Sequence, residues 1–127
     1  MSQKQYSLPH RSKVGAVGEQ IAVSYLLTKH FRVLERNFKA RLGEIDIVAL
    51  YGPTLVFVEV KTRSTTAFGS PESSVTGRKL AEVIQTGEYY LLLHPNQTRD
   101  MRIDVVAIML DPVSLTLVSL RHLRSVT

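Results

Sequence analysis

The sequence of 127 residues contains no cysteine. Disulfide bonds, thiolate metal sites and a cysteine nucleophile are therefore excluded. Its four histidines are scattered along the chain, which gives no indication of a zinc site. Any metal ion in this protein would have to be held by carboxylate or imidazole groups.

Long apolar runs are also missing, and no segment approaches the length of a membrane span. The N-terminal residues 1–13 are polar and basic and do not resemble a secretory signal. We therefore expect a cytoplasmic protein without a membrane-spanning segment. The length suits one domain, and 44% hydrophobic residues allow a core. We expect residues 1–13 to form a flexible basic arm and residues 14–127 to form a single domain.

Acidic residues are outnumbered, with 11 Asp and Glu against 16 Lys and Arg. The resulting net charge of +5 and pI of about 9.7 favour polyanionic partners, chiefly nucleic acid. The charge alone is weak evidence, because many basic proteins bind no nucleic acid specifically. The function therefore has to be argued from particular residues.

Hydrophobic periodicity predicts two helices and at least four strands. The helices are expected over 14–27 and 74–93, and the strands over 31–39, 44–50, 55–62 and 102–110, with a less clearly marked edge strand over 115–120. This α-β-β-β-α-β order predicts an α/β fold in which a central mixed sheet is flanked by helices.

The two central strands form a hairpin that holds the most informative residues. If the hairpin closes on residues 51–54, Asp46 lies opposite Glu59 and Glu44 lies opposite Lys61. Directly paired residues of an antiparallel hairpin have Cβ atoms roughly 4.5–5.5 Å apart. The sequence therefore predicts two facing carboxylates at a distance that one divalent ion can bridge, with a lysine beside them.

Two close carboxylates repel each other unless a positive charge lies between them. Magnesium suits this arrangement, because it takes oxygen ligands and often only one or two protein carboxylates. A bound magnesium ion can lower the pKa of a water molecule and neutralise charge on a phosphodiester. Lys61 could orient or deprotonate that water, or stabilise the developing charge.

The segments Gly43-Glu44-Ile45-Asp46 and Val58-Glu59-Val60-Lys61 together resemble the PD-(D/E)xK nuclease signature. The form is closest to that of archaeal-type Holliday junction resolvases, in which a residue such as Ile45 replaces the proline. From about Gly15 to Ile108 the chain resembles the YraN family of small bacterial predicted nucleases. Further matching segments are Gly18-Glu19, Arg36-Asn37, Phe57-Val58-Glu59-Val60-Lys61-Thr62-Arg63, Lys79 and Arg102-Ile103-Asp104-Val105-Val106.

The resemblance implies a restriction-endonuclease-like fold and a Mg²⁺-dependent (or Mn²⁺-dependent) endonuclease that hydrolyses DNA phosphodiesters in repair or recombination. Branched DNA is one substrate that it suggests, and the resolvase-like relatives suggest a homodimer. By the resemblance, Asp46 and Glu59 bind the metal and Lys61 acts on the nucleophile. Glu19 would join them from the first helix as an accessory acid and metal ligand.

Four basic residues are candidate contacts to nucleic acid: Lys79, Arg63, Lys13 and Arg11. A non-catalytic nucleic-acid-binding module and a protein scaffold with the same fold are the alternative functions. DNA binding without metal-dependent turnover would indicate the first alternative. An absence of DNA binding at low salt would favour the second.

Structural interpretations compete with the catalytic one. The residues Asp46, Glu59 and Lys61 could form a solvated charged face, although the apolar neighbours of Glu59 indicate a buried strand, where unpaired charges are costly. Glu19 could simply be an acid in the first turn of a helix. Glu44 is either a salt-bridge partner of Lys61 or a ligand of the metal ion.

For Lys79 and Asp104 a structural role is the favoured interpretation. Lys79 is more typical of a solvated helical lysine than of a phosphate contact. We expect Asp104 to be a partner of Arg102 or Arg36 and not a metal ligand.

Overall fold

The computed structural model describes residues 10–65 and 69–127. Its elements are α1 (His10–Thr28), β1 (Arg32–Ala40), β2 (Gly43–Tyr51), β3 (Thr54–Arg63), the short 3-10 helix η1 (Glu72–Ser74), α2 (Gly77–Leu93), β4 (Met101–Leu110) and β5 (Leu117–Leu123). The predicted order of helices and strands is confirmed, including the less clearly marked last strand. The resulting α/β architecture is consistent with a restriction-endonuclease-like fold.

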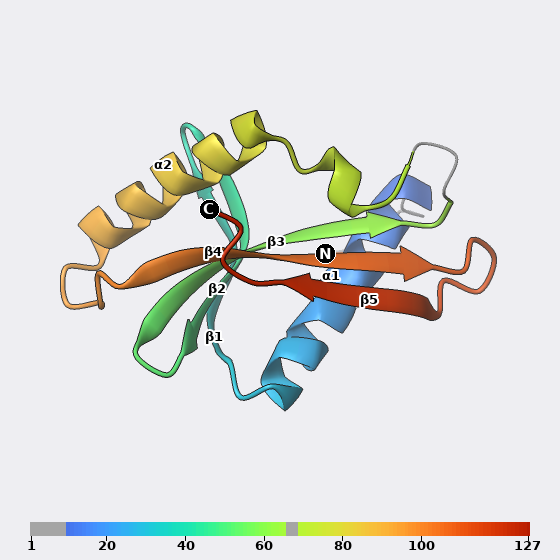
Figure 1. Cartoon of the computed structure of the whole chain (residues 1–127), viewed down its shortest axis with the longest axis horizontal. Coiled ribbons are helices and arrows are strands. Elements are labelled where there is room, and N and C mark those ends of the chain that lie inside the picture. The colour runs from blue at the N-terminus through green and yellow to red at the C-terminus, as the bar shows by residue number, and fades with distance from the viewer. Residues whose placement is uncertain (1–9, 66–68) are drawn as a thin grey trace, which may run out of the picture.

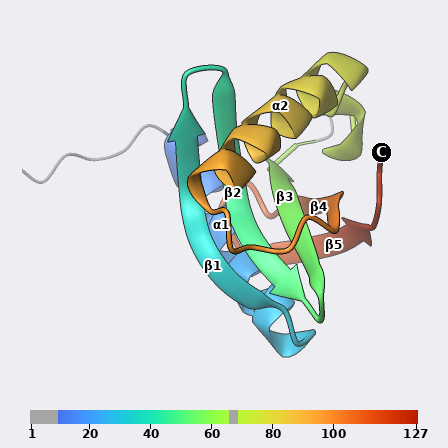
Figure 2. The same ribbon diagram turned by 90° about the vertical axis from the view of Figure 1, so that its left-hand side faces the viewer.

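The five strands form one mixed sheet in the order β1-β2-β3-β4-β5. The first three strands are antiparallel neighbours, β3 and β4 are parallel, and β5 returns antiparallel to β4. The parallel pair requires a crossover connection, which α2 supplies. The helices α1 and α2 cover opposite faces of the sheet (Figures 1 and 2).

Helix α1 packs closely against one face of the sheet. Its apolar residues Ala22 and Leu26 are fully buried against Ile47 and Val58 of the central strands. A Cβ atom on Gly18 would overlap the side chain of Thr62. The missing side chain therefore lets the start of α1 approach the end of β3, which is where the predicted site residues lie.

Helix α2 packs against the other face through a cluster of aromatic residues. The ring of Phe57 meets Tyr90 edge-on, with ring centroids 5.9 Å apart. A Cβ atom on Gly87 would overlap the Phe57 ring, so this glycine has a packing role within the helix. The helix begins later than predicted, because the Thr76 side chain accepts a hydrogen bond from the Lys79 amide at 3.2 Å and caps it.

The start of α1 differs from the expectation. The helix begins at His10 and not at Val14, so residues 10–13, which were assigned to the flexible arm, are helical. Their polar sequence carries no apolar periodicity, which is why the pattern alone placed the start later. The rest of the predicted arm, residues 1–9, lies outside the described residues.

Within residues 10–65 and 69–127, no helix is both long enough and apolar enough to cross a membrane.

Candidate active site

The hairpin of β2 and β3 has the predicted register. The ladder runs from the pair Tyr51 and Thr54 to the pair Ile47 and Val58. The strands extend further into the turn than expected, which leaves Gly52 and Pro53 as the connection, with Gly52 at a φ of 56°. This two-residue turn sets which side chains face each other along the hairpin.

The ladder ends before Asp46, and the predicted pairing is modified there. The backbone N–H of Val60 donates to Oδ2 of Asp46 at 2.8 Å. A carboxylate thus takes the position that a backbone carbonyl would have in a continued ladder, so Asp46 and Glu59 are not a ladder pair. The prediction that they lie directly opposite each other in the ladder was wrong in this respect.

Glu44 does not pair with Lys61 either. It pairs with Lys39 of β1, and within the described residues no ion pair joins Glu44 to Lys61.

Glu59 is buried on the α2 side of the sheet, with 4% of its surface exposed. Burial, together with repulsion by the neighbouring Asp46 carboxylate and a hydrogen bond with it, raises the pKa of Glu59 from 4.5 to about 8. The cations Lys79 and Lys61 act in the opposite direction on this pKa. The solvated-face interpretation therefore fails for Glu59, because its carboxyl group is withdrawn from water.

The contacts of Glu59 leave one oxygen atom without a hydrogen bond. Lys79 Nζ lies 3.9 Å from Glu59 Oε2, close enough for an ion pair but too far for a hydrogen bond. Among the buried side-chain atoms of the described residues, Glu59 Oε2 has no hydrogen-bond partner. An unsatisfied buried carboxylate oxygen is costly and needs a physical explanation.

A small cleft opens beside these carboxylates on the α1 side. Its volume is about 250 Å³, and its lining consists of Gly15, Glu19, Asp46, Val60, Lys61 and Thr62. Three of the four predicted catalytic residues, namely Glu19, Asp46 and Lys61, thus lie around one cleft. Glu59 is not part of this lining, and its electrostatic coupling to Asp46 connects it to the site.

Glu19 is held by residues of β1. Asn37 Nδ2 donates to Glu19 Oε1 at 2.9 Å, and Arg36 Nη2 lies 3.5 Å from the same oxygen. Asn37 has a positive φ of 53°, an uncommon conformation that asparagine tolerates. The predicted site did not include Asn37, although the Arg36-Asn37 segment already belonged to the resemblance.

The donor set can be compared with the needs of a metal ion. No three His, Cys, Asp or Glu side chains converge as a metal-binding group in the part of the chain that the structure describes. Asp46 and Glu59 nevertheless suit a magnesium ion, which often has only one or two protein carboxylates as ligands. The unbonded Oε2 of Glu59 and the repulsion between the two carboxylates are the features that a divalent cation would relieve.

Of the predicted nucleic-acid contacts, Lys79 contacts a site residue, and Arg63 and Lys13 lie close in sequence to residues of the cleft. Lys79 is paired with Glu59, and Arg63 follows Thr62 at the end of β3. Lys13 is exposed on α1, two residues before Gly15 of the cleft. Arg11 lies in the first turns of α1, but its side chain is outside the described part of the structure.

Asp104 has the structural role that was expected. Arg102 donates to both of its carboxylate oxygens, at 3.0 and 3.3 Å, and His122 Nε2 lies 2.8 Å from Oδ2. Burial would raise the pKa of Asp104, but hydrogen bonds from His122, Arg102 and the Ser125 amide outweigh it and lower this pKa. Asp104 therefore joins β4 to β5 and the C-terminus.

A mixed α/β sheet with a hairpin carrying Asp46, Glu59 and Lys61 is consistent with the restriction-endonuclease-like class. Residues 18–108 match the model of the family described as "Uncharacterised protein family UPF0102". The chain belongs to this family, which is the YraN family.

Its relatives include several bacterial UPF0102 proteins. One from Caldanaerobacter subterraneus subsp. tengcongensis is 39% identical over 90% of this chain and 93% of its own. Another, from Alkaliphilus oremlandii, is 46% identical over 77% of this chain and 86% of its own. A third, from Geotalea daltonii, is 49% identical over 76% of each chain.

Proposed function

We propose that this protein is a Mg²⁺-dependent endonuclease that hydrolyses DNA phosphodiester bonds. The observation that carries the proposal is the buried carboxyl of Glu59, which is coupled to Asp46 and keeps Oε2 without a hydrogen bond. A fold that buries such a group retains an unfavourable electrostatic arrangement. Strongly perturbed carboxylates with a specific charged partner are typical of functional sites.

Asp46 and Glu59 would hold the cation, Mg²⁺ or Mn²⁺. The Asp46 side chain is already oriented by the Val60 amide, which donates to its Oδ2 at 2.8 Å. When bound, the ion would supply a water molecule of lowered pKa and neutralise charge on the phosphodiester. Both carboxylates would then remain ionised, because the cation offsets their repulsion.

Lys61 lines the cleft beside Asp46 and is the candidate for acting on the attacking water. It would orient or deprotonate that water, or stabilise the charge that develops on the phosphate. Glu19 supports the site from α1, where Asn37 and Arg36 hold its carboxylate. We assign Glu19 an accessory role as a direct ligand or as the partner of a bound water.

The substrate follows from the charge around the cleft. Arg63 follows Thr62 of its lining and Lys13 precedes Gly15 by two residues, Lys79 lies on the α2 side, and the chain has a net charge of +5. Such a distribution suits a phosphate backbone. We propose DNA as the substrate, with branched DNA as a specific candidate, 5′-phosphate products, a dimeric enzyme that cuts both strands, and a cytoplasmic location.

Cleavage of labelled linear and four-way-junction DNA tests the proposal. The wild type should cut with Mg²⁺ or Mn²⁺ and not with EDTA, and Asp46→Ala and Lys61→Ala should each lose cleavage while keeping the fold. Asp100→Asn is a matched control, because Asp100 bonds Thr54 at the opposite end of the hairpin. Full cleavage by Asp46→Ala or Lys61→Ala would refute the role assigned to that residue.

A non-catalytic DNA-binding module is the second candidate. The ion pair of Lys79 with Glu59 favours it, because a lysine can supply part of the counter-charge without a metal. This candidate predicts DNA binding that is unchanged by EDTA and no turnover with any divalent ion. Metal-dependent cleavage that Asp46→Ala abolishes would decide against it.

A further inference from the structure

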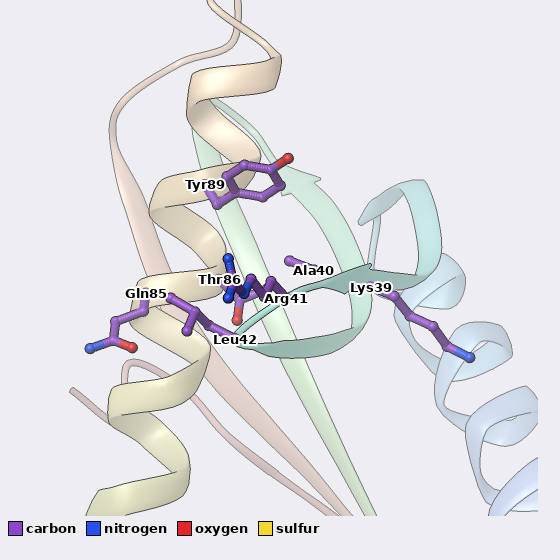
Figure 3. Close-up of a pocket in the computed structure, with 7 residues that line it drawn as sticks. All are labelled: Lys39, Ala40, Arg41, Leu42, Gln85, Thr86 and Tyr89. Carbon is purple, nitrogen blue, oxygen red and sulfur yellow. The ribbon is translucent and has the colours of Figure 1, made fainter.

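A second, larger groove lies between α2 and the turn that joins β1 to β2. Its volume is about 860 Å³, within the range of sites for small ligands. The lining residues are Lys39, Ala40, Arg41 and Leu42 of the hairpin and Gln85, Thr86 and Tyr89 of α2 (Figure 3). None of them belongs to the cleft described above.

The groove presents apolar surface to solvent. Leu42 is 62% exposed and Tyr89 is 45% exposed, and they come from opposite walls (Figure 3). The ring of Phe38 is a neighbour of the Tyr89 ring, with centroids 6.3 Å apart and an interplanar angle of 34°. Tyr89 therefore combines contact with a buried aromatic ring and substantial exposed area, which suits a stacking platform.

The charged residues of the groove all have one sign. Lys39 and Arg41 are both exposed, and no carboxylate is among the seven lining residues. Figure 3 shows Arg41 at the hairpin turn beside α2, whereas Lys39 extends from the same strand away from α2 and towards α1. Positive charge thus lies both at the groove and on the side of the sheet where the catalytic cleft opens.

The groove is also close to the proposed catalytic residues along the chain. Leu42 immediately precedes β2, and Asp46 follows four residues later on the same strand. A strand rises about 3.3 Å per residue, which separates the two positions by roughly 13 Å. Because the cleft opens on the α1 side and the groove on the α2 side, a nucleic-acid strand with its scissile phosphate at Asp46 would reach the groove by passing around the turn between β1 and β2.

We propose that this groove binds an unpaired base of the DNA substrate, stacked on Tyr89 and Leu42, with flanking phosphates on Arg41 and Lys39. The inference rests on the proposed function and names its substrate class: DNA with a single-stranded segment next to the cut. Aromatic stacking beside a basic surface is the usual means of holding unpaired strands, since every base offers a flat apolar face. Paired bases inside a duplex cannot offer this face.

The charges favour a nucleic acid over a protein in this groove. A second copy of this chain seated here would bring the same arginine and lysine together, and like charges at an interface are unfavourable. A polyanion, by contrast, complements both the rim and the net charge of +5.

Fluorescence anisotropy with a short labelled oligothymidylate and a duplex of the same length, both in EDTA, tests the inference. We expect the wild type to prefer the single strand, and Tyr89→Ala to weaken single-strand binding by roughly tenfold with much less effect on the duplex. Tyr89→Phe should keep the affinity. Arg41→Gln should weaken binding and reduce the salt slope by about one phosphate contact.

Arg78→Gln is the matched control, because Arg78 lies on α2 outside the groove with 92% of its side chain exposed. Equal single-strand affinity of the wild type and Tyr89→Ala would overturn the inference, as would equal effects of Arg41→Gln and Arg78→Gln. Because EDTA removes the metal, this assay is independent of cleavage. Cleavage by Tyr89→Ala at the wild-type rate on flapped DNA would likewise reject the groove but leave the nuclease proposal standing.

Discussion

Replacing Glu59 by glutamine tests the electrostatic state of the site. The substitution keeps the shape of the side chain and removes its ionisation. In the wild type, burial and the Asp46 carboxylate raise the pKa of Glu59 from 4.5 to about 8, against the opposing charges of Lys79 and Lys61. Between these two values the folded protein retains a proton that the unfolded chain has lost.

The direction of the effect follows from proton linkage. A group whose pKa is raised by folding contributes stability that is fully present below pH 4.5 and is lost as the pH rises through about 8. Each pKa unit corresponds to about 1.4 kcal/mol, so the interval allows a loss of at most about 5 kcal/mol. For a domain of this size such a loss is a large part of the total stability.

Urea denaturation in EDTA, from about pH 5 to about pH 9, measures this effect. The free energy of unfolding of the wild type should fall relative to that of Glu59→Gln across this range, and the variant should be the more stable protein at the alkaline end. Subtracting the curve of Glu59→Gln from that of the wild type cancels the contributions of the histidines to the pH dependence, because both proteins contain them. Parallel curves for the two proteins would refute the argument that Glu59 is buried with a raised pKa.

Three further predictions concern the fold and the N-terminus. Asp104→Asn should lower the free energy of unfolding by about 3–5 kcal/mol in urea titrations, because it leaves the buried Arg102 and His122 contacts without their carboxylate. In the wild type, the stability due to Asp104 is lost only as the pH falls through its lowered pKa, below 3.8. Gly18→Ala should cost about 1–3 kcal/mol, which Thr62→Ala partly restores in a double-mutant cycle, and simple additivity would contradict the close approach. Deletion of residues 1–9 should weaken DNA binding and reduce its salt dependence, and an unchanged salt slope would reject a role for this segment.

Much of the scaffold followed from local patterns in the sequence. Short runs rich in apolar and β-branched residues defined β2 and β3, and Gly52-Pro53 marked the turn between them. These two features together predicted the pairing of Leu50 with Leu55, which the structure confirms. The register was predictable because the short turn fixes which residues of the two strands face each other.

The finer geometry of the site was less predictable, because it depends on side chains that are distant in sequence. The Asp46 carboxylate accepts a hydrogen bond from the Val60 amide. This interaction competes with the strand ladder, and the pattern of apolar residues does not indicate it. Asn37 reaches Glu19 across 18 positions of the chain. In the same way, the periodicity of α2 showed that Lys79 lies on the helix but could not place it beside Glu59.

Isothermal titration of Mn²⁺ and Mg²⁺ into the wild type, Asp46→Ala and the control Asp100→Asn tests the central claim most directly. We predict saturable binding by the wild type and the control, and loss of binding in Asp46→Ala. Binding should release protons near neutral pH, because a Glu59 carboxyl with a pKa of about 8 must ionise to become a ligand. Equal binding by all three proteins, or no binding by the wild type, would contradict the assignment of Asp46 and Glu59 as a metal site.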